Sequence, residues 1–363
     1  MVERKILLTP GPATTSDSVK LSQVVPDICP RVKDFGNLML QISQDLVKIA
    51  GGDESYACVL FGGSGTAGME SVVSSALKGK ALIINNGAYG ERFVQIAEAY
   101  SIPHKELFFD WREKVDLKRI EKELAQDKSI SEIILVHHET TTGILNPIKQ
   151  IGELSKKFNC SFIVDAISSF AGVPFNAKDC NIDFMISTSN KCLQGLPGVC
   201  FIICKKEALE KTKEYPRKSF YLNLYDQYAF FLKNNQTRFT PPVQTLYALD
   251  KAISEFLEEG AENRYRRYSE NNKILTEGMQ GLGFTKIETA SEESGLLTTF
   301  YIPDHVDFNE MHDSLYSKGF SIYPGKIKEN TFRLASIGAL NQGDIKNFLE
   351  ALKTTLEESA NFN

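Results

Sequence analysis

Short apolar runs alternate with longer amphipathic segments through the middle of this 363-residue chain, and no other feature constrains its fold as strongly. The runs are almost continuously hydrophobic, which is typical of parallel strands covered on both faces by crossover helices. We expect strands at 81–85, 132–137, 161–166, 184–188 and 199–204, with helices at 68–77, 91–100 and 149–157. The pattern predicts a doubly wound α/β domain, in which ligands bind beyond the carboxyl ends of the strands.

The pattern changes after Pro241 and Pro242, where a second lobe is expected to begin. Two long charged helices are predicted at 243–258 and 261–281, then strands near 295–301 and 331–335 and helices near 308–318 and 342–359. A chain of this length exceeds the size at which one hydrophobic core usually stops growing. We therefore expect an N-terminal segment at 1–14, a large domain at 15–262 and a small C-terminal α+β domain at 263–363.

Charge and cysteine content exclude several classes of function. The net charge is −5, and the one compact basic group, Arg264, Arg266 and Arg267, is expected on a helix face, so no nucleic-acid partner is expected. No apolar run is long enough to cross a bilayer, and Pro10 and Pro12 interrupt any signal peptide, so we expect a cytoplasmic protein without a membrane partner. The seven cysteines show no CxxC spacing, which predicts reduced thiols and no metal site.

A glycine-rich turn at 61–77 joins an apolar run to a helix. Its glycines allow close backbone approach, Ser64 and Thr66 offer hydroxyls, and a helix N-terminus supplies free N–H groups, so the turn can bind a phosphate. A purely structural turn explains the same residues equally well. The turn lacks both the GK[ST] of a nucleotide-binding loop and a GxGxxG pattern, so a monophosphate group fits it better.

Two further residues stand just beyond expected strands. Asp165 ends an apolar strand, where a carboxylate is costly unless it meets a charge or several donors. It can keep the pyridine nitrogen of pyridoxal 5′-phosphate (PLP) protonated, or it can simply cap the next turn. Lys191 follows the strand at 184–188 and precedes a Gly/Pro-rich segment that can hold it rigidly. A lysine in such a place can form a Schiff base if it is desolvated, although most lysines are simply solvated.

Nine sequence strings extend along nearly the whole chain. They are LLTPGPATTS (7–16), GGSGTAGMES (62–71), NNGAYGERF (85–93), HHETTTGILNP (137–147), VDAISSFAG, SNKCLQGLPG, RFTPPVQTLYAL, IYPGK and FRLASIG. With them the chain resembles the class V, fold-type I PLP-dependent aminotransferases, and among these the 2-aminoethylphosphonate–pyruvate transaminases. Asn190 stands before the lysine, where cysteine desulfurases have histidine. The resemblance implies a large domain with a mostly parallel sheet flanked by helices and a smaller C-terminal α+β domain.

The resemblance also implies a role for each matching residue. The cofactor phosphate would be held by Ser64, Gly65 and Thr66, with Ser189 and Asn190 completing the cup. Tyr89 would stack on the pyridine ring, and Thr140, in a loop supported by Glu139, would lie near the phenolic oxygen of the ring; His137 and His138 would be structural. Asp165 would pair with the ring nitrogen and Lys191 would form the Schiff base. Thr240 would reach the cofactor phosphate of a partner subunit, so a homodimer is expected.

Arg333, in TFRLASIG, is the candidate for binding the substrate anion, because a guanidinium can hold carboxylate or phosphonate oxygens bidentately. A surface salt bridge is the alternative for this residue. The resemblance implies amino transfer from 2-aminoethylphosphonate to pyruvate, giving phosphonoacetaldehyde and L-alanine. The alternatives are an alanine/serine–glyoxylate or pyruvate aminotransferase of the same class and a non-catalytic PLP-binding scaffold. A scaffold has no need of Asp165, Lys191 and Arg333 together.

Overall fold

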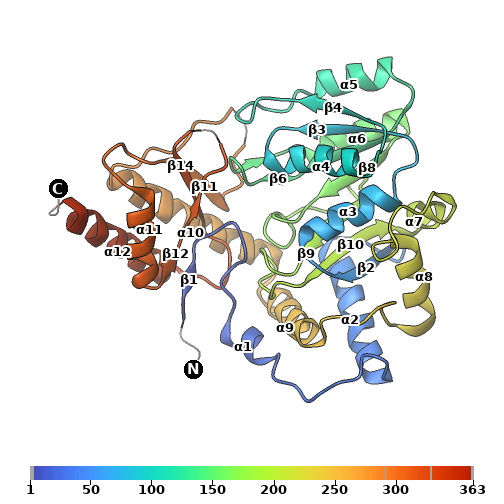
Figure 1. The fold of residues 1–363 in the computed structure, drawn as a ribbon, viewed down its shortest axis with the longest axis horizontal. Coiled ribbons are helices and arrows are strands. Elements are labelled where there is room, and N and C mark those ends of the chain that lie inside the picture. The colour runs from blue at the N-terminus through green and yellow to red at the C-terminus, as the bar shows by residue number, and fades with distance from the viewer. Residues whose placement is uncertain (1–3, 291, 328, 361–363) are drawn as a thin grey trace.

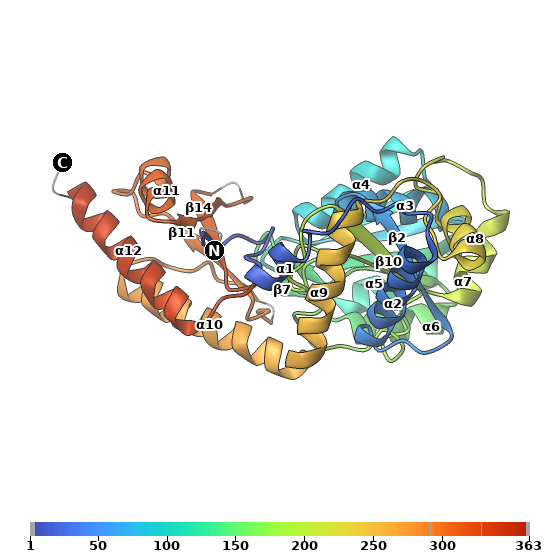
Figure 2. The same cartoon turned by 90° about the horizontal axis from the view of Figure 1, so that it is seen from below.

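A computed structural model describes residues 4–290, 292–327 and 329–360. The chain forms a large lobe around a central sheet and a smaller lobe that contains the C-terminal third (Figure 1). Seen from below, a long helix runs from one lobe into the other (Figure 2). The α/β architecture expected from the sequence is confirmed.

The central sheet has seven strands in the order β2-β10-β9-β8-β5-β3-β4. The strands are β2 Tyr56–Gly62, β3 Lys80–Asn85, β4 His104–Phe108, β5 Ile130–Val136, β8 Ser161–Asp165, β9 Phe184–Thr188 and β10 Val199–Lys205. All five expected strands are present, but the sheet is mixed, because β10 is antiparallel to both β9 and β2. An antiparallel neighbour needs no crossover helix, so a short loop suffices between β9 and β10, and this loop carries Lys191.

Helices cover both faces of the sheet, as the continuous apolar strands predict. The helices of this lobe are α1 Asp17–Leu21, α2 Lys33–Ile49, α3 Gly65–Ser75, α4 Ala88–Ala99, α5 Leu117–Gln126, α6 Ile148–Phe158, α7 Lys206–Lys211, α8 Leu224–Asn234 and α9 Val243–Glu259. Successive residues of β5 enter different cores: Ile133 packs with residues of α2, α5, α6 and α9, whereas Ile134 packs with residues of α3 and α4. Both faces of the strand are therefore buried.

The small lobe begins with α10 Ala261–Gly281, which follows α9 after a single residue, Gly260. Gly260 has a φ of +81°, which allows the bend between the two helices. A three-stranded sheet of β11 Leu297–Tyr301, β14 Thr331–Ala335 and β13 Tyr323–Pro324 packs with α11 Phe308–Ser317 and α12 Gln342–Ala360. The N-terminal strand β1 Ile6–Leu7 pairs with β12 Phe320–Ser321 of this lobe. The predicted elements of the C-terminal part are present, and the two-residue strands β12 and β13 are additions.

None of the helices in the described ranges combines the length and the apolar character that a membrane crossing requires. Across the same ranges, no three histidine, cysteine, aspartate or glutamate side chains gather where they could hold a metal ion.

Candidate functional site

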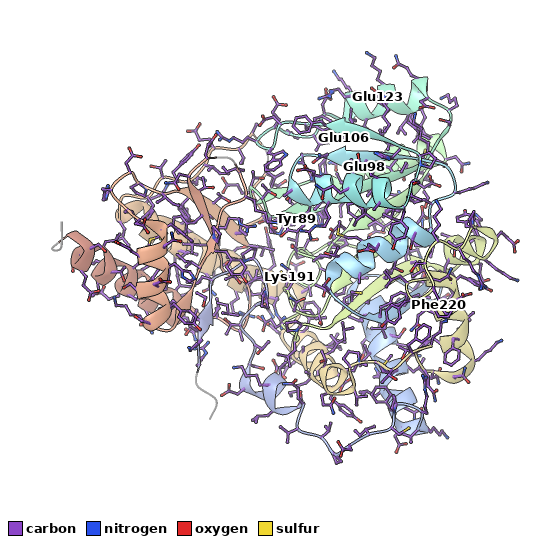
Figure 3. The ribbon with its side chains drawn as sticks, in the orientation of Figure 1. Tyr89, Glu98, Glu106, Glu123, Lys191 and Phe220 are labelled. Atoms are coloured by element: carbon purple, nitrogen blue, oxygen red, sulfur yellow. The ribbon has the colours of Figure 1, made fainter. Side chains whose placement is uncertain are left out.

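The polar residues singled out in the sequence come together at one edge of the central sheet. Strands β2, β3, β5, β8 and β9 all direct their carboxyl ends to this edge, and a short two-stranded ribbon, β6 His138–Glu139 with β7 Ile144–Leu145, follows β5. Between this edge and the small lobe is a cavity of about 390 Å³, lined by Pro10, Gly11, Tyr89, Lys191, Tyr323, Pro324, Gly325, Lys326 and Arg333. Tyr89 and Lys191 lie on the side of the large lobe that faces the small one (Figure 3).

Lys191 extends its amine into this cavity and meets the N-terminal segment. Its Nζ donates a hydrogen bond to the carbonyl oxygen of Pro10 at 2.5 Å. A Cβ atom added to Gly11 would lie 2.3 Å from this Nζ, and Gly11 has a φ of +133°, so a glycine is required for the close approach. Burial lowers the pKa of Lys191. A lowered pKa makes the neutral, nucleophilic amine more available near neutral pH, which a Schiff-base lysine requires.

Asp165 is a buried carboxylate without an ion-pair partner among the described residues. Its side chain is at the end of β8, the residue is 3% exposed, and Oδ1 accepts a hydrogen bond from the backbone N–H of Ile167 at 2.8 Å. The capping interpretation is thus correct for one oxygen atom. Burial raises the pKa of Asp165 to about 7. A carboxylate in this state fits a protonated ring nitrogen, which would supply the missing positive charge.

The raised pKa of Asp165 has a measurable effect on the stability of the cofactor-free protein. Between about pH 4 and pH 7 the unfolded chain releases this proton while the folded chain keeps it, so the free energy of unfolding falls as pH rises. We expect the wild type to lose on the order of 2–4 kcal/mol between pH 4 and pH 8 relative to Asp165→Asn. Urea unfolding at a series of pH values measures this difference, and parallel stability profiles for the two proteins would contradict it.

The glycine-rich turn leads directly into α3 and has free groups for an anion. Ser64 is the N-cap residue of α3, and its hydroxyl does not cap the helix. The hydroxyl of Thr66 accepts a hydrogen bond from Nη1 of Arg92 at 3.2 Å, which brings a cation to the turn. A Cβ atom at Gly65 would lie 2.7 Å from Cδ1 of Ile167, so a larger residue there would require Ile167 to shift. Free N–H groups, a free hydroxyl and a nearby guanidinium suit a phosphate group.

The other residues expected at the phosphate are placed differently. The hydroxyl of Ser189 is bonded within its own loop, to the carbonyl oxygens of Leu196 at 2.5 Å and Val199 at 3.2 Å. The Oδ1 atom of Asn190 accepts from the hydroxyl of Thr188 at 3.0 Å. Thr240 is exposed in the segment between α8 and α9. The cofactor roles of Ser189, Asn190 and Thr240 stay predictions.

Tyr89 is held at the mouth of the site by Glu139. The buried Glu139 carboxylate accepts hydrogen bonds from the backbone N–H groups of Tyr89 at 3.1 Å and Gly90 at 3.2 Å, in the first turn of α4, and from the hydroxyl of Thr141 at 2.6 Å. The supporting role predicted for Glu139 thus has a direct geometric basis. The Thr140 hydroxyl is also buried here and, apart from its closeness to the Tyr89 phenol, has no hydrogen-bond partner among the described residues.

Arg333 is on β14 of the small lobe, and it is 3% exposed. Its Nη1 donates to the carbonyl oxygen of Thr140 and its Nε to that of Pro324, both at 3.2 Å. No carboxylate pairs with Arg333 in the described part of the chain, so a surface salt bridge does not explain it. A buried guanidinium that lacks a counter-ion and lines a cavity can bind an anionic ligand.

The two adjacent histidines are buried and neutral. Nδ1 of His137 lies 2.9 Å from the hydroxyl of Ser169, and Nδ1 of His138 lies 3.0 Å from the carbonyl oxygen of Ser168. Burial lowers the pKa of His137 to about 3 and that of His138 to about 4. Nε2 of His138 is buried with no hydrogen-bond partner among the described residues, and this residue lies near Lys191. The site therefore has unpaired polar groups as well as unpaired charges.

These features fit PLP. The turn at α3 suits its phosphate, Asp165 suits a protonated ring nitrogen, and Lys191 supplies an amine for covalent attachment. Three residues of the site were not predicted from the sequence: Gly11, Arg92 and Lys326. Arg92 could have been found, because it follows Tyr89 by three residues and therefore shares its face of a helix. Gly11 and Lys326 reach the site through tertiary contacts that leave no local signal.

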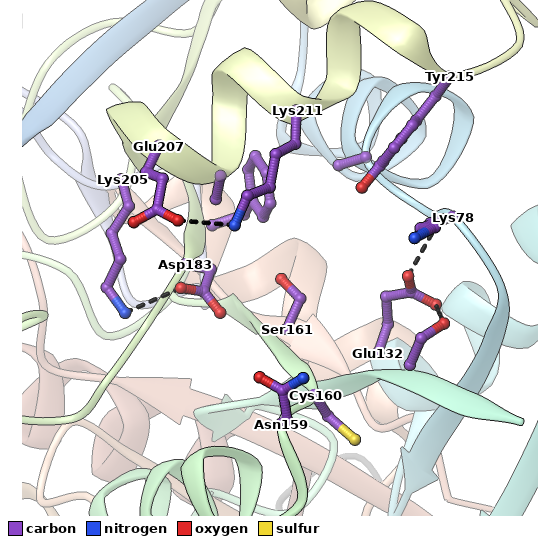
Figure 4. A pocket seen from close by; sticks show the side chains of 14 residues that line it. Lys78, Glu132, Asn159, Cys160, Ser161, Asp183, Lys205, Glu207, Lys211 and Tyr215 are labelled. Carbon is purple, nitrogen blue, oxygen red and sulfur yellow. Dashed lines mark hydrogen bonds and ion pairs between the residues drawn. The ribbon is translucent and has the colours of Figure 1, made fainter. Parts of the chain in front are cut away.

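A second cavity, of about 420 Å³, is at the opposite edge of the sheet (Figure 4). Four of its charged side chains form ion pairs: Lys205 contacts Asp183 at 2.8 Å and Lys211 contacts Glu207 at 2.7 Å. The Glu132 carboxylate accepts from the backbone N–H of Lys78 at 2.9 Å. Its lining carries three acidic and three basic side chains, so it lacks the excess of positive charge that marks the first cavity.

Comparison with known proteins supports the same interpretation. Residues 29–327 match the model of the family described as aminotransferase class-V. A 2-aminoethylphosphonate–pyruvate transaminase of Bacteroides fragilis (strain YCH46) is 40% identical over 358 residues, which cover 96% of this chain and 98% of the relative. The transaminase of the same name from Phocaeicola vulgatus is 41% identical over 357 residues, with the same coverage of 96% and 98%.

Among solved structures, an alanine–glyoxylate aminotransferase from Nostoc sp. superposes with a TM-score of 0.90 at 25% sequence identity. The superposition covers 98% of this chain and 96% of the Nostoc protein. Both lobes and their relative arrangement are therefore shared with that enzyme.

Proposed function

The chain belongs to the class-V aminotransferases, and from this we propose that it transfers the amino group of 2-aminoethylphosphonate to pyruvate, giving phosphonoacetaldehyde and L-alanine. The relatives that carry this name share about two fifths of their residues with the chain over 96% of its length. The observation that carries the proposal in the structure is one cavity lined both by an amine of lowered pKa, Lys191, and by a guanidinium without a carboxylate partner among the described residues, Arg333. Such a site can hold an anionic amine donor with its amino group toward Lys191.

We propose PLP as the cofactor, attached through a Schiff base to Lys191. When bound, PLP withdraws electrons from the substrate carbon and so makes its proton removable. Asp165 would keep the ring nitrogen protonated, and the absence of a cation in contact with its carboxylate among the described residues favours that pairing. Ser64, Gly65 and Thr66 would hold the phosphate, with Arg92 beside Thr66.

The protein residues then carry out the proton transfer. Once the substrate amine has replaced Lys191, the free Lys191 amine would be the base that takes a proton from the substrate carbon bearing the nitrogen, and it would deliver that proton to the cofactor carbon bonded to the same nitrogen. The carbonyl oxygen of Pro10, 2.5 Å from Nζ, holds this amine at the cavity wall. Arg333 binds the phosphonate in the first half of the reaction and the pyruvate carboxylate in the second, so one cation serves both substrates.

The second candidate function is alanine/serine–glyoxylate or pyruvate amino transfer, and the superposition on the Nostoc enzyme favours it as the alternative. Turnover with several amino donors separates the two. With pyruvate as acceptor, we expect 2-aminoethylphosphonate to be used at least about a hundredfold better, in kcat/KM, than L-serine, because only the phosphonate fully uses the site's cationic groups. A preference for L-serine, or for L-alanine with glyoxylate, would replace the main proposal with the alternative.

We further propose that the protein is a homodimer whose sites are completed by Thr240 of the other subunit. Two features support this: Phe220 is 78% exposed (Figure 3), and its ring lies 5.7 Å from that of Phe239, which precedes Thr240 in the chain. An exposed aromatic group beside a residue expected at the cofactor is typical of an interface. Sedimentation velocity tests this, and a monomer at micromolar concentration would contradict it.

We also propose a cytoplasmic location. The seven unpaired cysteines support a reducing compartment, and cell fractionation tests this location.

A further inference from the structure

We infer that Lys326 is a second cation of the substrate-anion site and that it selects a phosphonate over a carboxylate. The inference rests on the proposed function, since it names what distinguishes the two substrates of that reaction. Lys326 follows β13 in the small lobe, and it lines the same cavity as Lys191 and Arg333. No role for it follows from the sequence alone.

The position of Lys326 is set by one contact across the two lobes. Its Nζ lies 4.7 Å from the centroid of the Tyr89 ring, which belongs to the large lobe. The side chain is exposed and forms no ion pair within the described ranges. An ammonium group that has only a ring face for a partner remains free to donate all three of its N–H groups to a ligand.

The charges around the cavity match a phosphonate better than a carboxylate. The lining contains Lys191, Lys326 and Arg333, and it contains no aspartate or glutamate. A guanidinium fork satisfies two oxygens in one plane, which is all that a carboxylate offers. A phosphonate has a third oxygen and carries up to two negative charges, so it needs one more donor from another direction. Lys326 can supply that donor on a flexible four-carbon stem.

Supporting Tyr89 is the competing role for Lys326. The guanidinium carbon of Arg92 lies 4.8 Å from the centroid of the same ring, so Tyr89 already has a cation partner within its own helix. The two roles predict different results. Loss of a support for Tyr89 would weaken cofactor binding and would affect every substrate equally, whereas loss of a phosphonate donor would affect phosphonates alone.

The test compares two ligands that lack the reacting amine, ethylphosphonate and propionate, which share an ethyl group and differ in the anion. Isothermal titration calorimetry of the PLP-loaded protein gives their affinities for the wild type, Lys326→Met, Lys326→Arg and a control, Lys353→Met. Lys353 is an exposed residue of α12 and is not a cavity residue. Cofactor absorbance is recorded for each variant.

We expect Lys326→Met to weaken ethylphosphonate binding roughly tenfold, as for one lost charge-assisted hydrogen bond, and to change propionate binding less than twofold. Lys326→Arg should keep most of the preference, and Lys353→Met should keep all of it. Equal losses for both ligands, an altered cofactor absorbance or no loss at all would each overturn the inference. Because no amino transfer is involved, the result stands apart from whether the wild type uses 2-aminoethylphosphonate as a donor.

Discussion

Lys191→Ala is expected to lower the turnover number by at least about 10⁴-fold, the largest effect of any single substitution in this chain. The substitution removes both the amine that attaches the cofactor and the base that moves the proton, and positioned proton transfer alone contributes about 10²–10⁴-fold. The fold should survive, because in the described structure the Lys191 side chain forms one hydrogen bond, to Pro10, and pairs with no carboxylate.

Steady-state formation of alanine from 2-aminoethylphosphonate and pyruvate measures this loss, and the visible absorbance of the cofactor reports the lost covalent attachment. Lys346→Ala is the matched control, since it removes an exposed lysine of α12. It should retain full activity. If Lys191→Ala kept more than about 1% of the wild-type turnover, another residue would have to be the base.

Arg333→Ala is expected to lower kcat/KM by about 10³-fold for both 2-aminoethylphosphonate and pyruvate. Two charge-assisted hydrogen bonds of roughly 1.5–3 kcal/mol each would be lost in each half of the reaction. Arg333→Lys should recover only part of this loss, because an ammonium cannot match the planar fork. A loss confined to one of the two substrates would contradict the role of Arg333 as the shared anion site.

Arg333→Ala also needs a stability control, because the guanidinium donates to the backbone carbonyls of Thr140 and Pro324. Leaving these two acceptors without their donor is expected to cost about 1–3 kcal/mol of unfolding free energy. Urea unfolding of the variant measures that cost, and activity is compared under conditions where both proteins are fully folded.

The sequence predicts most of the fold because its strands are buried on both faces. Such strands read as continuous apolar runs, and all five expected ones in the large lobe are present. The two edge strands of this sheet, β2 and β4, were not predicted: β4 has three polar residues, His104, Lys105 and Glu106, and β2 was recognised only as the apolar run before the glycine-rich turn. Local sequence patterns also do not predict that β10 is antiparallel to β9, because the direction of a strand depends on which strands pair.

The residues of the candidate site also divide into those that a local sequence signal predicts and those that it does not. Asp165 and Lys191 could be singled out because each is a polar residue just beyond an apolar strand, and the topology brings these strand ends together. Gly11 and Lys326 could not, because they approach Lys191 and Tyr89 from segments far away in the sequence. The sequence places Ser189 near Lys191, but it does not predict the hydrogen bonds of the Ser189 hydroxyl. These bonds go to carbonyl oxygens of the same loop.

A half-reaction spectrum shows whether Lys191 supports amino transfer from 2-aminoethylphosphonate. Purified protein with PLP is mixed with 2-aminoethylphosphonate, L-alanine or L-serine in separate experiments, and the visible absorbance of the cofactor is followed. We expect the phosphonate to bleach this absorbance and pyruvate to restore it. A response to alanine or serine with none to the phosphonate would contradict the proposed substrate, and the absence of any cofactor absorbance would contradict the PLP chemistry itself.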